Sequence, residues 1–251
     1  MTQTQTDEGA EGPGTAAWWD AHAERLQRRR PRAGGLTVER IVAEALALVD
    51  RDGLDALTVR HLAGALGTSS ATLYRHVASV DELLVLMIDQ VLGEIDLPDA
   101  DRPARERVTH LAVEFRRVLV EHPGMVPALR ASPLLGPNAM RGAESGLAYL
   151  LEMGFAPSVA VSGYLALIDY VLGSVFFDTA SGGDRSPVGP PRRPAGSQGP
   201  LAEGSAVTGA RSGSALIVHR DALQAASSAE VFRLGLTAFL DGLEQRHGPH
   251  R

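Results

Sequence analysis

Residues 53–84 read GLDALTVRHLAGALGTSSATLYRHVASVDELL, and this stretch decides the fold. Thr58 precedes apolar residues at helical spacing, and Gly67 ends that short helix. Ser69, or the residue before it, caps a second short helix that runs to Val77. Two short helices joined by a glycine and a three-residue polar turn have the spacing of a helix-turn-helix. An ordinary helical hairpin has similar spacing, so the spacing alone does not establish DNA binding.

The second helix would present hydroxyl, ring and basic side chains outward, as a recognition helix in the major groove does. Small hydroxyl groups let the backbone approach phosphate, a tyrosine can reach a phosphate oxygen, and an arginine can bind guanine or the backbone. The segment from residue 56 to residue 80 holds no acidic residue, although the formal net charge is -6. Local charge matters more than the sum, because affinity comes largely from neutralised phosphates. The candidate DNA-binding residues are Arg60, Ser69, Ser70, Thr72, Tyr74, Arg75 and His76.

Helical periodicity also runs through the rest of the chain, and alternating strand patterns are nearly absent. A helix begins after Thr37 and ends at Gly53, and a capping box at Ser79–Glu82 opens a further helix that ends before Pro98. The sequence therefore predicts an all-α fold with an N-terminal three-helix helix-turn-helix domain. A C-terminal helical domain is expected to follow it.

Six helices are expected in this second domain. Four cover about 103–121, 125–130, 137–153 and 158–179, and two follow residue 214, the last of them opened by a capping box at Ser227–Glu230. The helix over 158–179 is apolar around most of its circumference, which indicates that both of its sides are buried. We therefore expect the core on one side and a second copy of the chain on the other. Asp169 and Asp178 are expected at the rim of that interface or in a ligand pocket.

Composition divides the chain into three parts. Residues 1–35 are expected to be a flexible or partly helical extension, residues 36–97 the DNA-binding domain, and residues 98–245 the ligand-binding and dimerisation domain. Residues 181–214 are rich in Gly, Pro and Ser and are expected to form a disordered insert. The run Arg28 to Arg32 is either a solvated linker or an arm that contacts DNA. The Trp18–Trp19 pair is expected to dock the extension onto the surface.

The segment Leu36 to Ile95 closely resembles the DNA-binding domain of the TetR family, above all in its LT.R.LA..LG....TLY.HV pattern. The later stretches FRRVLVEHPGMVPAL, GPNAM, YLLEMGF and VLGSVFFD resemble that family's regulatory domain in the same order. The resemblance thus covers roughly residues 36–245. It implies a homodimeric repressor that binds a palindromic operator and is released by a small hydrophobic effector. It also implies DNA contacts from Arg60, Thr72, Tyr74 and His76. Val80 stands where the family often has a phosphate-binding lysine.

Helical domains of this kind enclose apolar pockets with a few polar groups. The candidate ligand-binding residues are Leu111, Phe115, Leu129, Leu147, Tyr164 and Ile168. Simple core packing explains any single leucine among them equally well. Tetracycline repressors hold a magnesium–drug complex with His, Asn and Gln, and the corresponding positions here resemble Leu111, Leu129 and Gly146. We therefore expect no tetracycline, no metal and no cofactor.

Other functional classes find less support. The chain has no cysteine and none of the motifs of hydrolases, phosphate-binding loops or zinc proteases, so no enzymatic activity is expected. An acidic helical adaptor would fit the net charge but leaves the acid-free segment unexplained. Residues 1–14 are polar and acidic, and we expect no apolar run to reach bilayer length. A cytoplasmic protein without membrane contact is expected, with operator DNA, an effector and a second copy as partners.

Overall fold

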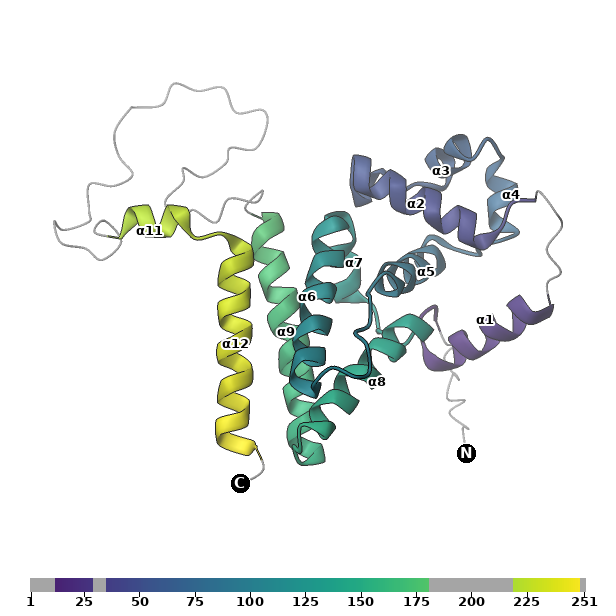
Figure 1. The fold of residues 1–251 in the computed structure, drawn as a ribbon. Helices are drawn as coiled ribbons and strands as arrows, with labels where there is room; N and C mark the ends of the chain where they lie inside the picture. Colours follow the sequence, from purple (N-terminus) through teal and green to yellow (C-terminus); the bar gives the residue numbers. More distant parts are fainter. Residues whose placement is uncertain (1–11, 29–34, 181–218, 249–251) are drawn as a thin grey trace, which may run out of the picture.

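The structure is a computed structural model that describes residues 12–28, 35–180 and 219–248. All regular secondary structure in these ranges is helical, which confirms the predicted fold class. Figure 1 shows α2, α3 and α4 grouped at one end, α9 and α12 side by side at the other, and α5 between the two groups. The helices are α1 (Ala16–Arg28), α2 (Val38–Asp52), η1 (Leu54–Ala56), α3 (Val59–Ala65), α4 (Ser70–Tyr74), α5 (Val80–Gly93), α6 (Ala104–Glu121), η2 (Pro123–Met125), α7 (Val126–Ala131), α8 (Pro137–Glu152), α9 (Pro157–Ala180), α11 (Arg220–Ala225) and α12 (Ser228–His247).

One hydrophobic core joins both groups of helices. Helix α5 is apolar on most sides, and its Met87 and Val91 are fully buried because α2 packs on one side of it and α8 on another. Helices α6, α8 and α9 pack on one another, with Val108 and Val118 of α6 and Val171 of α9 at 0% exposure. A displacement of α5 therefore changes contacts with both the N-terminal helices and the C-terminal domain.

The extension before residue 36 contains an ordered helix. The sequence predicted a flexible or partly helical segment over residues 1–35, but residues 16–28 form α1. Trp18 and Trp19 pack against the core, as their predicted docking requires, and His22 stacks on Trp18 with ring centroids 4.9 Å apart. Residues 16–28 thus fit the partly helical alternative, and the aromatic side chains of α1 cover part of the core. The arginine run after Arg28 lies outside the described residues.

The start of α5 differs in detail from the predicted capping box. Ser79 Oγ accepts a hydrogen bond from the Glu82 amide at 3.0 Å, as expected. Glu82 Oε2, however, accepts from the amide of Ala78 at 2.6 Å instead of that of Ser79. Its other oxygen lies 3.5 Å from Arg25 and 3.8 Å from His22 of α1. The carboxylate of Glu82 thus connects the two helices, a contact that the local sequence pattern does not predict.

Helix α9 corrects the membrane prediction made from the sequence. Its segment Pro157–Phe176 is long and apolar enough to cross a membrane, with a mean hydropathy of 1.7, so the expectation that no run reaches this length was wrong. Only 33% of that segment is buried within the protomer. One side packs against α6 and α8, and α12 lies beside it. The predicted insert, residues 181–214, lies outside the described residues, as does the side chain of Asp178.

Candidate DNA-binding surface and effector cavity

The helix-turn-helix is built from capped short helices. Thr58 Oγ accepts from the His61 amide and Ser69 Oγ from the Thr72 amide, each at 3.2 Å, so both predicted caps are present. Each hydroxyl satisfies an amide that has no partner within its own helix. Between the helices, Gly67 has a φ of 62°, a left-handed conformation that other residues adopt only at a cost. Helix α4 ends at Tyr74, three residues earlier than predicted, and Val77 reaches the core from the following turn.

The structure places the candidate DNA-binding residues on one accessible surface. Arg60, Ser69, Tyr74 and Arg75 are exposed, with Tyr74 at 53%, whereas Leu62 of α3 and Leu73 of α4 point into the core. The remaining candidates, Ser70, Thr72 and His76, are half-buried. All seven residues therefore lie on or directly beside α3 and α4.

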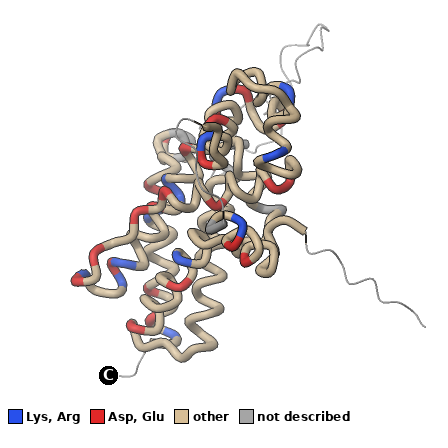
Figure 2. Tube along the Cα trace, turned by 90° about the vertical axis from the view of Figure 1, so that its right-hand side faces the viewer, with Lys and Arg blue, Asp and Glu red and all other residues tan. Residues whose placement is uncertain are grey.

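Polar contacts organise the outer side of α4. Ser69 Oγ and Thr72 Oγ1 lie 3.0 Å apart, and Arg75 donates to Thr72 Oγ1 at 3.1 Å. The guanidinium is thus held along the outer side of the helix by this hydrogen bond. Basic and acidic residues are both spread over the described part of the molecule (Figure 2). The helix-turn-helix is distinguished by the absence of acidic residues from position 56 to position 80.

A cavity of about 240 Å³ lies in the C-terminal domain between α5, α6, α8 and α9. Its wall is almost entirely apolar. Tyr164 and Asn138 are the side chains there that carry strong hydrogen-bonding groups, and burial raises the pKa of the Tyr164 hydroxyl, which therefore stays protonated. The lining residues are Leu92, Ile95, Leu111, Ala112, Phe115, Leu134, Asn138, Ala139, Gly142, Ala143, Tyr164, Leu165, Leu167, Ile168 and Val171.

Four of the six ligand candidates line this cavity and two do not. Leu111, Phe115, Tyr164 and Ile168 face it, whereas Leu129 is 2% exposed in the core and Leu147 packs against the core elsewhere. Sequence reasoning missed the floor of the cavity, which small residues of α8 form. Asn138, Ala139, Gly142 and Ala143 follow at helical spacing and share one face, a signal that a search for large apolar residues passes over.

Helix α5 contacts the cavity in two ways. Leu92 and Ile95 form part of its wall. Asp89, one turn earlier, is buried, and its Oδ1 accepts from the amides of Asn138 and Ala139 at 3.0 and 3.1 Å. It therefore caps α8, whose own N-cap is a glycine. Burial raises the pKa of Asp89, although these donors favour its charged form. The helix that follows the helix-turn-helix is thus bonded to the first turn of the cavity floor.

Comparison with known proteins identifies the family. Residues 97–247 match the family described as tetracyclin repressor-like, C-terminal domain. Residues 41–87 match the family described as bacterial regulatory proteins, tetR family. The C-terminal match alone covers more than half of the 251 residues. The chain belongs to the TetR family. The resemblance seen in the sequence is confirmed, and this TetR-family protein is a DNA-binding transcriptional regulator.

Individual relatives agree with this assignment. An HTH-type transcriptional regulator of Saccharopolyspora erythraea is 37% identical over 175 residues, which cover 69% of this chain and 71% of that protein. The HTH-type transcriptional repressor DrrR1 of Streptomyces coeruleorubidus is 34% identical over 58% of this chain and 56% of its own length. Among solved structures, the Streptomyces coelicolor TetR family protein ActR in complex with actinorhodin superposes with a TM-score of 0.69. It is 28% identical and covers 86% of this chain and 98% of its own.

Proposed function

We propose that this TetR-family regulator is a repressor that binds a palindromic operator as a homodimer and releases it when a small hydrophobic effector occupies the cavity. The observation that carries the proposal is the position of α5. Leu92 and Ile95 line the cavity, Asp89 caps the cavity floor, and the same helix packs against α2 of the DNA-binding domain. An effector that favours a different position of α5 would change the placement of the recognition helix.

The chemistry of the cavity defines the class of effector. An apolar wall with one amide and one phenol favours a largely hydrophobic, uncharged molecule with one or two hydrogen-bonding groups. A strongly charged effector would lose its hydration without gaining an ionic partner, because none of the described residues that line the cavity is charged. The related ActR was solved with actinorhodin bound, which supports a small organic molecule as the class of ligand. No metal or cofactor enters this proposal.

The proposed dimer rests on apolar side chains that one protomer leaves exposed. On α9 these are Val161, Leu165 and Phe176, and on α12 they are Val231 and Leu234, which is 74% exposed. The two helices lie side by side, so two copies related by a twofold axis would bury all of these residues in a four-helix interface. Two recognition helices would then meet half-sites about one helical turn apart. The exposed Asp169 would lie at the rim.

We retain the division into a DNA-binding domain at 36–97 and a ligand-binding and dimerisation domain at 98–245 as part of this proposal. The two family matches, over residues 41–87 and 97–247, support this division. We also propose that the DNA contacts come from Arg60, Ser69, Ser70, Thr72, Tyr74, Arg75 and His76. A regulator that acts on chromosomal DNA functions in the cytoplasm, which is where we place this protein.

The test combines an operator obtained by in vitro selection with a screen for molecules that raise the melting temperature. Ala143→Leu fills part of the cavity floor and should weaken the response to any molecule found, with operator affinity nearly unchanged. Ala148→Leu makes the same change at an exposed site of α8 and serves as the control. Operator release at the same ligand concentration for both variants would move the effector site away from this cavity.

A further inference from the structure

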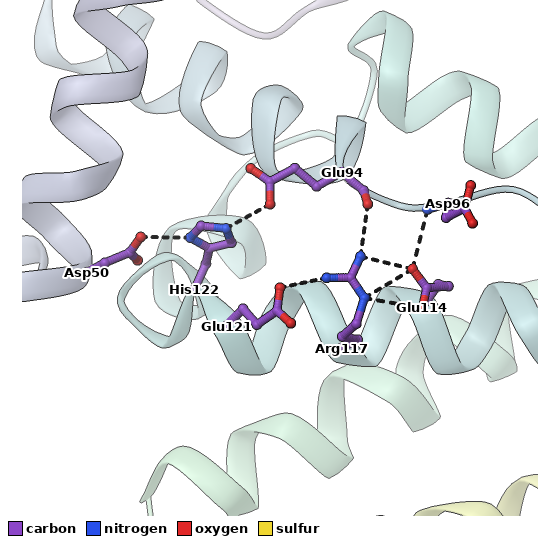
Figure 3. Close-up of polar contacts among 7 residues, drawn as sticks. All are labelled: Asp50, Glu94, Asp96, Glu114, Arg117, Glu121 and His122. Atoms are coloured by element: carbon purple, nitrogen blue, oxygen red, sulfur yellow. Dashed lines mark hydrogen bonds and ion pairs between the residues drawn. The ribbon is translucent and has the colours of Figure 1, made fainter.

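A histidine lies where three parts of the protein meet. His122 ends α6, directly before η2. Its Nδ1 lies 2.9 Å from Asp50 Oδ2 of α2, and its Nε2 lies 3.0 Å from Glu94 Oε2 at the end of α5 (Figure 3). The imidazole therefore connects the DNA-binding domain, the linking helix and the C-terminal domain. We call these three residues the His122 bridge.

The His122 bridge is complete only when the imidazole is protonated. A neutral imidazole has one N–H and one lone pair, so it can donate to a single carboxylate. The imidazolium donates from both nitrogens and forms two charge-assisted hydrogen bonds. When the proton leaves, one nitrogen faces a carboxylate oxygen with its lone pair, and that contact changes from attraction to repulsion. Loss of one proton thus removes one of the two connections.

The other charged groups around His122 leave the two carboxylates available to it. On α6, Arg117 donates to Glu121 at 2.6 Å and to Glu114 at 2.9–3.1 Å, so its charge is balanced locally. Arg117 also donates to the backbone carbonyl of Glu94 at 3.0 Å, which fixes the residue whose carboxylate binds the histidine.

The remaining elements that pack here add no further partner for the two carboxylates. On α2, Arg51 is paired with its neighbour Asp52. Residues 123–129, which form η2 and most of α7, contain no charged side chain. Burial lowers the pKa of His122, but the hydrogen bond to Glu94 and the charge and hydrogen bond of Asp50 outweigh it, and the net pKa is raised above 6.5.

The backbone next to His122 is packed tightly against α2. A Cβ on Gly124 would lie 2.7 Å from Val49 Cγ1 and 3.1 Å from the Val49 carbonyl oxygen, so only glycine fits without movement. Asp50 follows Val49 directly, and Gly124 is two residues from His122. The distance between η2 and the end of α2 therefore depends on the His122 bridge and on this contact together. Because this contact is already close, a shift of His122 would displace the end of α2 as well.

We propose that the His122 bridge makes the coupling between the two domains depend on the proton concentration, so that pH is a second input to operator binding. The proposal deepens the regulatory role proposed above and rests on it. The proton would act at a site separate from the effector cavity, because none of the three residues lines that cavity. Both inputs reach α5, one through Asp89 and the cavity wall and the other through Glu94.

The sign of the effect on stability follows from the raised pKa. The folded protein holds the His122 proton more tightly than the unfolded chain does, so the bridge contributes stability that is fully present below about pH 6.5. That contribution is lost as the pH rises through the folded-state pKa. At still higher pH, one bond remains and the other contact is repulsive.

The first experiment compares urea unfolding of the wild-type protein and His122→Gln from pH 5.5 to 8.5. Glutamine keeps one neutral donor and does not titrate. The stability difference in favour of the wild type should be largest at the acidic end and should shrink above pH 6.5. His219→Gln, at an exposed site, is the matched control and should show no such dependence. A pH-independent difference between wild type and His122→Gln would overturn the titration of the bridge.

The second experiment measures operator affinity at pH 6.0 and 8.5 at fixed ionic strength. We expect the ratio of the two affinities to differ about fivefold or more between the wild-type protein and His122→Gln, in the range of ordinary coupling between sites. His61 and His76 of the helix-turn-helix are present in both proteins, so any contribution from them cancels in the comparison. Asp50→Asn combined with Glu94→Gln should behave like His122→Gln.

The outcomes separate the two proposals. If both proteins bind the operator with the same pH ratio, the bridge is only a structural contact and the inference is wrong. If in vitro selection yields no operator at all, the proposed function fails. The unfolding experiment then still decides whether the bridge titrates as described. An NMR titration of labelled histidine decides it independently, because the pKa of His122 should fall in Asp50→Asn.

Discussion

Leu234 offers the sharpest test of the proposed homodimer. Among the described residues it is the large hydrophobic side chain with the greatest exposure, 74%, and it lies on α12, away from the cavity. Val231 precedes it by one turn, and Leu165 of the neighbouring helix α9 is 57% exposed. We predict that Leu234→Glu weakens dimerisation without unfolding the protomer, because the side chain contributes little to the core of its own chain.

The magnitude follows from the exposed fraction. Full burial of a leucine side chain contributes about 1.5–3 kcal/mol. With 74% of Leu234 available to a partner, each copy would contribute about 1–2 kcal/mol, and the twofold axis doubles this to about 2–4 kcal/mol per dimer. At 1.4 kcal/mol per tenfold, the dimer Kd should rise by about 30- to 1,000-fold. A buried carboxylate adds a further penalty, so the range is a lower bound.

Sedimentation velocity over a dilution series measures this Kd directly. Leu151→Glu is the control, since Leu151 is 42% exposed on α8, outside the proposed interface. Leu172 and Phe239, which helical periodicity also suggests as interface positions, are poorer choices because both are partly buried against the core of their own chain. The reasoning fails if Leu234→Glu keeps the wild-type Kd, or if Leu151→Glu dissociates the dimer equally well.

Three further predictions concern the DNA surface, the turn and the cap of α8. Arg60→Ala and Tyr74→Ala should each weaken operator binding, by about 1–3 kcal/mol where a base contact is lost, in a titration at fixed salt; normal affinity of both would refute the surface. Gly67→Ala should destabilise by about 1 kcal/mol because of its positive φ, whereas Gly64→Ala, in open space within α3, should stabilise by roughly 0.5–1 kcal/mol in urea unfolding. Asp89→Ala should cost about 2–4 kcal/mol, since two amides of α8 lose their acceptor; a change under 0.5 kcal/mol would show that water replaces it.

Local patterns predicted the helical framework well because short-range chemistry determines it. The hydroxyl caps at Thr58 and Ser69 and the glycine at 67 are visible as residue types, and each has the predicted role. The capping box at Ser227–Glu230 is complete. The box at Ser79 is only half formed because Glu82 bonds one residue further back and also faces α1. The contact between Glu82 and α1 is tertiary, so the local sequence does not predict it.

The candidate site was predictable on the DNA side and only in part at the cavity. The candidate DNA-binding residues lie within 17 consecutive positions, so spacing along two short helices places them together. The cavity is assembled from four helices, and it exists where side chains are small, as at Gly142 and Ala143. Large apolar residues such as Leu129 and Leu147 look like pocket residues in the sequence but fill the core instead. The His122 bridge joins residues 28 and 72 positions apart, a separation that no helical pattern reveals.

Helix α9 places ligand selection and subunit recognition on one segment of chain. Leu165 lines the cavity and is also 57% exposed toward the proposed partner, while Leu167, Ile168 and Val171 complete the same wall. During evolution, a mutation that adapts this wall to a new effector also alters the surface by which a subunit recognises its own kind. Duplicated copies that diverge in their ligands would thereby tend to stop pairing with each other. Paralogous regulators in one cell would then avoid forming mixed dimers as a by-product of a change in ligand specificity.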